Sequence, residues 1–266
     1  MRTFSYGGGV QSTAALILTA EGKLDYPVFL FANVGEDSEN PKTLAYVRDV
    51  AMPYAQRHGI ELHEIRRYTK TGHAETVMER LLGDNRSVPI PVRGANGGPA
   101  FRRNCTVDFK IKVMMKWLKK HGATADNPAI TGLGISIDEI HRMRIGTEPQ
   151  QLLEYPLIDL HLSRAQCMEI IRKSELPIPA KSSCYFCPYH TPTEWGRMKR
   201  EEPELFQASV DLEQKLNEKL KRIGHKKPVW FTRFAKPLDE AIGNQDAFDF
   251  TIEDELDNCE SGYCMV

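Results

Sequence analysis

Short apolar segments alternate with amphipathic helical patterns along the N-terminal part of the chain. The pattern predicts strands at 2–6, 28–32 and 60–66 and helices at 11–21 and 41–57, with Gly22 and Gly59 as helix stops. The segment 28–32 is continuously apolar, which is typical of a buried parallel strand. The β-α-β-α-β order predicts a parallel sheet with right-handed crossovers.

The later part of the chain carries weaker but similar signals. It predicts helices at 108–120, 163–172 and 194–223, and strands at 129–135 and 155–158. The glycine- and proline-rich segment 89–99 predicts a mobile loop or lid. We therefore expect an α/β domain over 1–160, followed by a cysteine-containing helical region over 161–266 that packs on it.

Composition restricts the class of protein only modestly. The 266 residues are 41% hydrophobic and 27% charged, with a formal net charge of −1. A protein whose main role is to coat nucleic acid is therefore not expected. No apolar run approaches the roughly 18 residues that a membrane helix needs. The first residues enter a predicted strand at once, which predicts a cytoplasmic protein without a signal peptide or membrane partner.

A run of three glycines, Gly7 to Gly9, joins the first predicted strand to the first predicted helix. Glycines allow backbone N–H groups to approach phosphate oxygens, and a helix N-terminus adds positive potential. Ser12 and Thr13 supply hydroxyl donors at the same place. No lysine follows as in a Walker loop, and the spacing differs from Gly-x-Gly-x-x-Gly. The loop therefore indicates phosphate binding, with a purely steric glycine turn as the alternative.

Three stretches resemble one known family. Residues 7–12 are similar to the Ser-Gly-Gly-x-Asp-Ser loop of N-type ATP pyrophosphatases, with Ser5 displaced by one residue and Gln11 in place of the aspartate. Residues 33–43 resemble an Asp-Thr-Gly-x-x-x-Pro-Glu-Thr segment, and residues 132–139 with Arg142 resemble a later nucleotide-proximal strand and loop. Together these stretches resemble the phosphoadenosine phosphosulfate reductase-like family, within the PP-loop superfamily.

The resemblance implies a Rossmann-like adenine nucleotide α-hydrolase fold, with ligands at the carboxyl ends of the strands. It implies ATP and Mg²⁺ as ligands. Ser12 and Asp138 become candidate catalytic residues. The candidate nucleotide-binding residues are Ser5, Gly7, Gly8, Gly9, Gln11, Ser12, Thr13, Asn33, Gly134, Arg102 and Arg103. Asp138, Glu139 and Arg142 are candidates for positioning magnesium or substrate, or alternatively form an acidic N-capping turn.

The family contains two kinds of enzyme. One adenylates an acceptor with ATP, releases pyrophosphate and lets a sulfur nucleophile displace AMP; the other reduces a sulfonucleotide with a C-terminal cysteine. The reductase motif Glu-Cys-Gly-Leu-His is absent, which favours the adenylating enzyme. The reductase alternative would use Cys264 or Cys259 as its nucleophile. A non-catalytic nucleotide-binding accessory protein is a third alternative.

The cysteines indicate metal or redox chemistry more than packing. Cys184 and Cys187 form a Cys-x-x-Cys knuckle suited to a soft metal. By resemblance, Cys105 supplies a third ligand, and the three thiolates would hold a [4Fe-4S] cluster with one open iron. One alternative is a structural zinc site with four thiolates, from Cys184, Cys187, Cys259 and Cys264. Another is a metal-free thiol pair. Cys167 lies in a helical pattern and is expected in the core.

The acceptor cannot be identified from these motifs. We expect a nucleobase or a related small molecule, and the near-neutral charge weakens the case for a free-standing RNA partner. Arg102 and Arg103 suit phosphate groups because guanidinium offers a bidentate fork. A sulfur-donor protein and a second copy of the chain are further partners that this interpretation allows.

Overall fold

The computed structural model describes residues 1–243, and these residues form two compact units. The first unit combines Met1–Ala74 with Thr106–Ser183, and the second combines Glu75–Cys105 with residues 184–243. Each unit is thus built from two separate stretches of chain. The division expected at residue 160 falls inside the first unit, between two of its helices.

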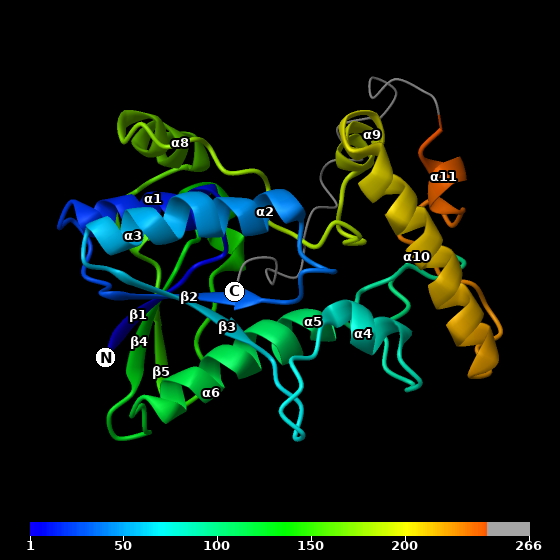
Figure 1. Cartoon of the computed structure of the whole chain (residues 1–266), viewed down its shortest axis with the longest axis horizontal. Helices are drawn as coiled ribbons and strands as arrows, with labels where there is room; N and C mark the ends of the chain where they lie inside the picture. Colours follow the sequence, from blue (N-terminus) through cyan, green and yellow to red (C-terminus); the bar gives the residue numbers. More distant parts are fainter. Residues whose placement is uncertain (244–266) are drawn as a thin grey trace. The chain divides into compact units, whose positions relative to one another are not determined.

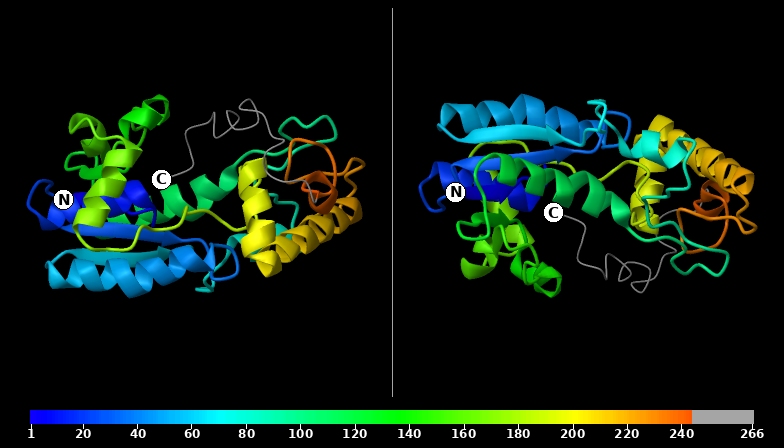
Figure 2. Two further views of the ribbon diagram at one scale, coloured as in Figure 1. Left: turned by 90° about the horizontal axis from the view of Figure 1, so that it is seen from above. Right: turned by 90° about the horizontal axis from the view of Figure 1, so that it is seen from below.

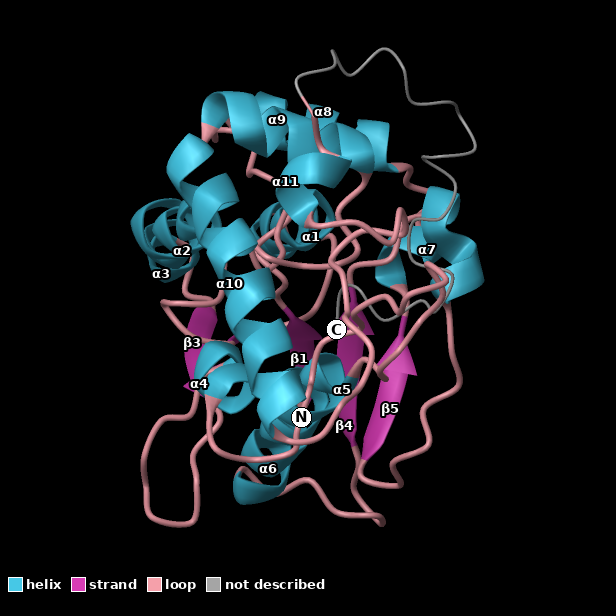
Figure 3. Ribbon diagram, turned by 90° about the vertical axis from the view of Figure 1, so that its right-hand side faces the viewer, coloured by secondary structure: helices cyan, strands magenta, loops and turns pink. Residues whose placement is uncertain are grey.

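A five-stranded parallel sheet forms the centre of the first unit (Figure 3). Its strands are β1 (Arg2–Ser5), β2 (Val28–Asn33), β3 (Glu61–Arg66), β4 (Ala129–Leu133) and β5 (Gln151–Glu154). They are ordered β3-β2-β1-β4-β5, and each neighbouring pair is parallel. The unit is therefore an α/β structure compatible with a Rossmann-like fold, in which the same 3-2-1-4-5 order occurs.

Helices cover both faces of this sheet (Figures 1 and 2). One face carries α1 (Val10–Ala20), α2 (Pro41–Tyr46), the π-helical turn η1 (Val47–Ala51), α3 (Met52–Arg57) and α8 (Arg164–Lys173), and the other carries η2 (Val107–Ile111) and α6 (Lys112–Lys120). Alternate residues of β2 separate the two cores: Phe29 and Phe31 pack with α1, whereas Leu30 and Ala32 pack with α6. This explains the continuously apolar sequence of β2.

Two predicted elements are wrong in detail. Residues 155–158 were expected to form a strand, but β5 ends at Glu154 and the helical turn α7 (Pro156–Asp159) follows. Pro156 occupies the first helical position, where its fixed φ and missing N–H are tolerated. The helix expected over 194–223 is divided at Glu202, because the residue before a proline avoids helical geometry.

The second unit is mainly helical. It contains α4 (Val77–Leu82), α9 (Pro192–Glu201), α10 (Pro203–Arg222) and α11 (Leu238–Ala241), and α10 contacts the other three. This unit's first stretch ends at Cys105, within the short helix α5 (Asn104–Thr106). The buried Lys219 ammonium of α10 donates to the carbonyls of Leu81, over 2.7 Å, and Ser87, over 3.1 Å. This contact terminates α4 and ties it to α10.

Among residues 1–243, no helix combines the length and apolar character needed to cross a membrane.

Candidate functional site

The sheet of the first unit reverses its strand order at β1 and β4. The chain continues from β1 to β2 and β3 on one side, while β4 and β5 lie on the other. Ser5, the last residue of β1, is in register with Leu133, the last residue of β4. The loops that leave these two strands are therefore neighbours, and in open parallel sheets ligands bind at such a reversal.

The glycine loop occupies this position, between β1 and α1. Gly8 has φ +75°, and a Cβ there would lie 2.8 Å from Cγ2 of Thr43. Only glycine fits this conformation and this space. The loop leads directly into the first turn of α1 at Val10, whose backbone N–H groups have no partner inside the helix. The arrangement concentrates amide donors and positive helix-dipole potential at one point.

The two hydroxyls predicted to bind phosphate have different surroundings. Ser12 Oγ donates to the Gly9 carbonyl over 3.0 Å and accepts from the Gly9 N–H over 3.2 Å. Ser12 therefore shapes the loop itself. Thr13 is fully buried, and its hydroxyl pairs with the Tyr6 hydroxyl over 3.0 Å. In this structure Thr13 contributes to the core beneath the loop.

Gln11, which stands where the motif that this loop resembles has an aspartate, connects α1 to the segment after β4. Its side-chain N–H donates to Glu139 Oε2 over 3.2 Å and to Ser136 Oγ over 3.4 Å, while its carbonyl accepts from Arg164 Nη1 over 3.0 Å. A Cβ on Gly134 would lie 3.2 Å from the Ser12 backbone nitrogen. Gly134 therefore allows this segment to pass close to the start of α1.

The polar residues of η3 (Ile137–Arg142) are held by this same network. Asp138 accepts from the backbone N–H of Arg164 over 2.8 Å and so caps the start of α8. Glu139 accepts from Arg142 Nη1 over 2.7 Å. Arg142 is buried, and within the described chain its Nε–H has no hydrogen-bond partner. An unsatisfied buried guanidinium N–H at a strand-order reversal is a donor available for an anion.

Asn33 ends β2 and is enclosed by charged neighbours. Its amide donates to Glu64 Oε1 over 3.0 Å and Glu36 Oε1 over 3.1 Å, and its carbonyl accepts from the Gly35 N–H over 2.8 Å. Hydrogen bonds from Arg48 lower the pKa of Glu36. Asn33 thus organises the turn after β2.

Sequence reasoning missed the segment that returns to the glycine loop from residue 182. Ser182 Oγ donates to the Gly7 carbonyl, and the Asn40 N–H donates to the Ser183 carbonyl over 3.1 Å. Among the described residues, the buried hydroxyls of Ser183 and Thr43 have no hydrogen-bond partner. These hydroxyls fit a ligand with acceptor oxygens, and no local spacing links residue 182 to residue 7.

Arg102, Arg103 and the predicted metal ligands Cys105, Cys184 and Cys187 all belong to the second unit. The Arg103 guanidinium lies over the Tyr189 ring, 5.4 Å from its centroid. The three cysteines are half-buried.

Cys184 and Cys187 form a tight turn, because the Cys187 N–H donates to the Cys184 carbonyl over 3.1 Å. Within residues 1–243, no group of three or more His, Cys, Asp or Glu side chains is placed to hold a metal ion. The assignment of an iron-sulfur cluster stays a prediction. Cys259 and Cys264 lie outside the described residues. Cys167 is buried on α8, and burial raises the pKa of its thiol to about 12.

No protein-family model matches this chain, and none of the curated proteins matches it.

Proposed function

We propose that the first unit binds an adenine nucleotide at the carboxyl ends of β1 and β4, and that the chain is an ATP pyrophosphatase that adenylates an acceptor for sulfur transfer. One observation supports this most directly. The glycine loop, with Gly8 at φ +75°, lies at the strand-order reversal and leads into the N-terminus of α1. The family resemblance of the three motifs supplies the reaction.

The phosphate groups would be bound by donors of three kinds. Backbone N–H groups of the glycine loop and the first turn of α1 are the first. The buried hydroxyls of Thr43 and Ser183, which have no partner within the described part of the chain, are the second, and the Arg142 guanidinium is the third. All of these belong to the first unit. Mg²⁺ takes one or two carboxylates together with phosphate and water oxygens, and Asp138 and Glu139 are the first carboxylates that follow β4 in the chain.

In the proposed reaction an acceptor oxygen attacks the α-phosphorus of ATP. The bond between the α-phosphorus and the bridging oxygen breaks, and pyrophosphate leaves with the electron pair. A sulfur nucleophile then displaces AMP from the acceptor. The loop donors would stabilise the negative charge that develops on the leaving pyrophosphate.

Isothermal titration of ATP into the full chain tests the binding site. Thr43→Val removes an unpartnered hydroxyl at nearly constant volume, so ATP affinity should fall by about three- to tenfold with little change in stability. Thr19→Val is the matched control, because the Thr19 hydroxyl bonds the Ala15 carbonyl near the other end of α1. Absence of ATP binding in the wild-type chain would refute the proposal.

Product analysis with ATP labelled at the α-phosphate tests the reaction. AMP and pyrophosphate, formed when nucleobase-containing acceptors are added, support adenylation. ADP and phosphate as the products contradict it. Sulfite released from a sulfonucleotide establishes the reductase alternative instead, and tight ATP binding with no turnover on any acceptor establishes a non-catalytic role.

A further inference from the structure

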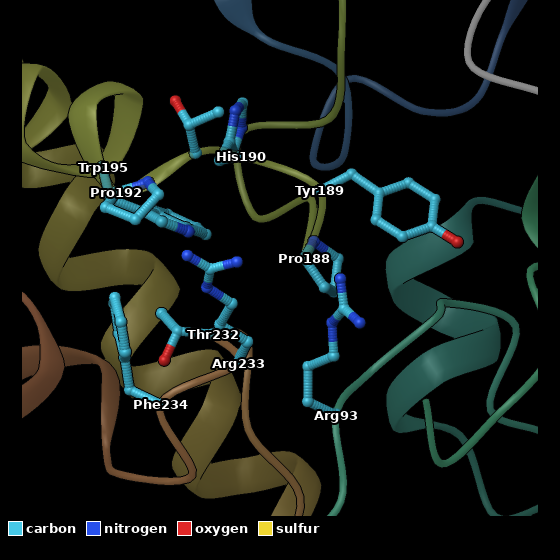
Figure 4. Close-up of a pocket in the computed structure, with 10 residues that line it drawn as sticks. Arg93, Pro188, Tyr189, His190, Pro192, Trp195, Thr232, Arg233 and Phe234 are labelled. Carbon is cyan, nitrogen blue, oxygen red and sulfur yellow. The ribbon is translucent and has the colours of Figure 1, made fainter. Parts of the chain in front are cut away.

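A pocket opens within the second unit, in a part of the chain that the proposed nucleotide site does not use (Figure 4). Its lining includes Arg93, His190, Trp195, Thr232, Arg233 and Phe234. It contains about 380 Å³ of empty space, including the part open to solvent.

Backbone contacts hold the walls of this pocket together. Arg93 and Trp230 form a reciprocal pair, with N–H···O distances of 2.8 and 2.9 Å. Gly97 has φ +75°, and a Cβ there would lie 2.3 Å from the Arg233 carbonyl oxygen. The glycine-rich segment 89–99, expected as a lid, is therefore anchored against residues 230–233. These backbone contacts therefore fix the walls of the pocket.

Three polar atoms of the lining lack a hydrogen-bond partner in the described chain. They are the indole Nε1–H of Trp195, the hydroxyl of Thr232 and the Nε–H of Arg93. Trp195 is 0% exposed and Thr232 is 5% exposed. Buried polar groups are nearly always satisfied, and an unsatisfied one costs free energy. Three such groups around one pocket indicate a ligand that accepts hydrogen bonds.

The charge of the lining identifies the kind of acceptor. Arg93 and Arg233 contribute guanidinium groups, and the lining contains no aspartate or glutamate. Figure 4 shows both guanidinium groups reaching toward the segment from Pro188 to Trp195. The nearby Glu194 carboxylate accepts from the Thr191 N–H over 3.0 Å, and His190 Nδ1 is 3.5 Å from it. This carboxylate is thus used in capping α9, and the pocket remains a cluster of donors.

We propose that this pocket binds a tetrahedral oxyanion, either inorganic phosphate or sulfate, or a single phosphate group of a nucleic-acid backbone. Arg93 and Arg233 supply the positive charge, and Trp195 and Thr232 supply directed neutral donors. Guanidinium groups match the oxygen geometry of phosphate, and the indole and hydroxyl donors complete the set. All of its lining residues belong to the second unit, whereas the donors of the proposed ATP site belong to the first.

Nuclear magnetic resonance of the indole N–H groups tests the proposal with inorganic phosphate as the probe. Trp195→Phe assigns the Trp195 signal by its loss. Phosphate should shift that signal saturably in the wild-type chain, and sulfate should compete. Thr232→Val should lower the affinity for phosphate by about three- to tenfold, and Arg93→Gln should lower it by about tenfold or more. Arg86→Gln, an equal change of charge at an exposed position of the same unit, should leave binding unchanged.

Two further readouts separate ligand binding from structure. Thr232→Val should not lower the melting temperature without phosphate, since it removes a hydroxyl that has no partner. None of these variants should alter ATP affinity. A failure of the oxyanion-site proposal is therefore distinguishable from a failure of the proposed function.

A short single-stranded oligonucleotide in place of phosphate distinguishes the two sources. Binding that Arg93→Gln abolishes, and that is tighter than for phosphate, identifies a nucleic-acid phosphate; weaker or no binding identifies the free anion. An absent shift, a non-saturating shift, or an equal loss in Arg86→Gln overturns the proposal.

Discussion

The side-chain amide of Gln11 donates a hydrogen bond to Glu139 Oε2 over 3.2 Å, which joins the first turn of α1 to the segment after β4. Arg164 completes the link by donating to the Gln11 carbonyl over 3.0 Å. A buried glutamine thus occupies the position that carries an aspartate in the PP-loop motif that this segment resembles. In this chain the residue connects the two loops at the strand-order reversal.

Gln11→Ala should lower the free energy of unfolding by about 1–2 kcal/mol, because the fully buried Gln11 side chain loses its hydrogen bonds to Glu139 and Arg164. Urea unfolding measures this change. Gln207→Ala is the control: Gln207 pairs with Asp211 on an exposed helical face, and its loss should cost no more than about 0.5 kcal/mol. Equal effects of the two substitutions would contradict a connecting role for Gln11.

Gly8→Ala should both destabilise the chain and impair ATP binding. The substitution places a side chain at φ +75° and drives its Cβ to 2.8 Å from Thr43. Gly22→Ala is a matched control, because Gly22 has φ +71° but no atom within 4 Å of a built Cβ. Both should lose about 1–2 kcal/mol from left-handed backbone strain.

Only Gly8→Ala should lose more stability than this and also reduce ATP affinity. Thermal unfolding and calorimetric titration measure the two effects. An unaltered ATP affinity in Gly8→Ala would separate the glycine loop from nucleotide binding.

Glu213 should make stability depend on pH. Burial raises the pKa of this carboxyl to about 7, although it accepts from the backbone N–H groups of Phe231 and Leu238. Between the unfolded pKa near 4.5 and the folded pKa near 7, the folded chain holds a proton that the unfolded chain has released. The contribution of Glu213 therefore decreases as pH rises through this window.

Glu213→Gln removes that titration. The difference in free energy of unfolding between about pH 5 and about pH 7.5 should change by on the order of 1–3 kcal/mol relative to wild type, in the direction of a smaller loss at high pH. Urea unfolding at the two pH values measures it. Because carboxyls such as Glu36 have lowered pKa values and act in the opposite direction, the comparison is made with wild type. Identical pH profiles for the two chains would refute the assignment.

The cluster prediction is tested by anaerobic purification. A brown protein containing iron and acid-labile sulfide is expected if Cys105, Cys184 and Cys187 hold a [4Fe-4S] cluster. Cys187→Ser should lose the colour, whereas Cys167→Ala should keep it, because Cys167 is buried in the core of the first unit. Colourless protein with stoichiometric zinc would contradict the cluster prediction and support a structural zinc site.

Local patterns predicted most of the first unit correctly. Strands β1, β2 and β3 and the helices between them lie within one or two residues of their expected positions. These elements are readable because apolar periodicity and helix stops act over a few residues. The segment 155–158 failed because a short apolar run fits a strand or a helical turn equally well, and Pro156 began a helical turn.

The candidate sites were predicted only in part, for a different reason. The sequence by itself determined the glycine loop, its place after the first strand and the alternation of strands and helices, since these depend on neighbouring residues. Tertiary structure alone decided the strand order, which brings Gln11 to Glu139 and Ser182 to Gly7. It also decided which buried donors, such as Trp195 and Thr232, have no partner among residues 1–243. Such relationships join residues far apart in the chain, and they follow from how packed elements exclude water rather than from any local pattern.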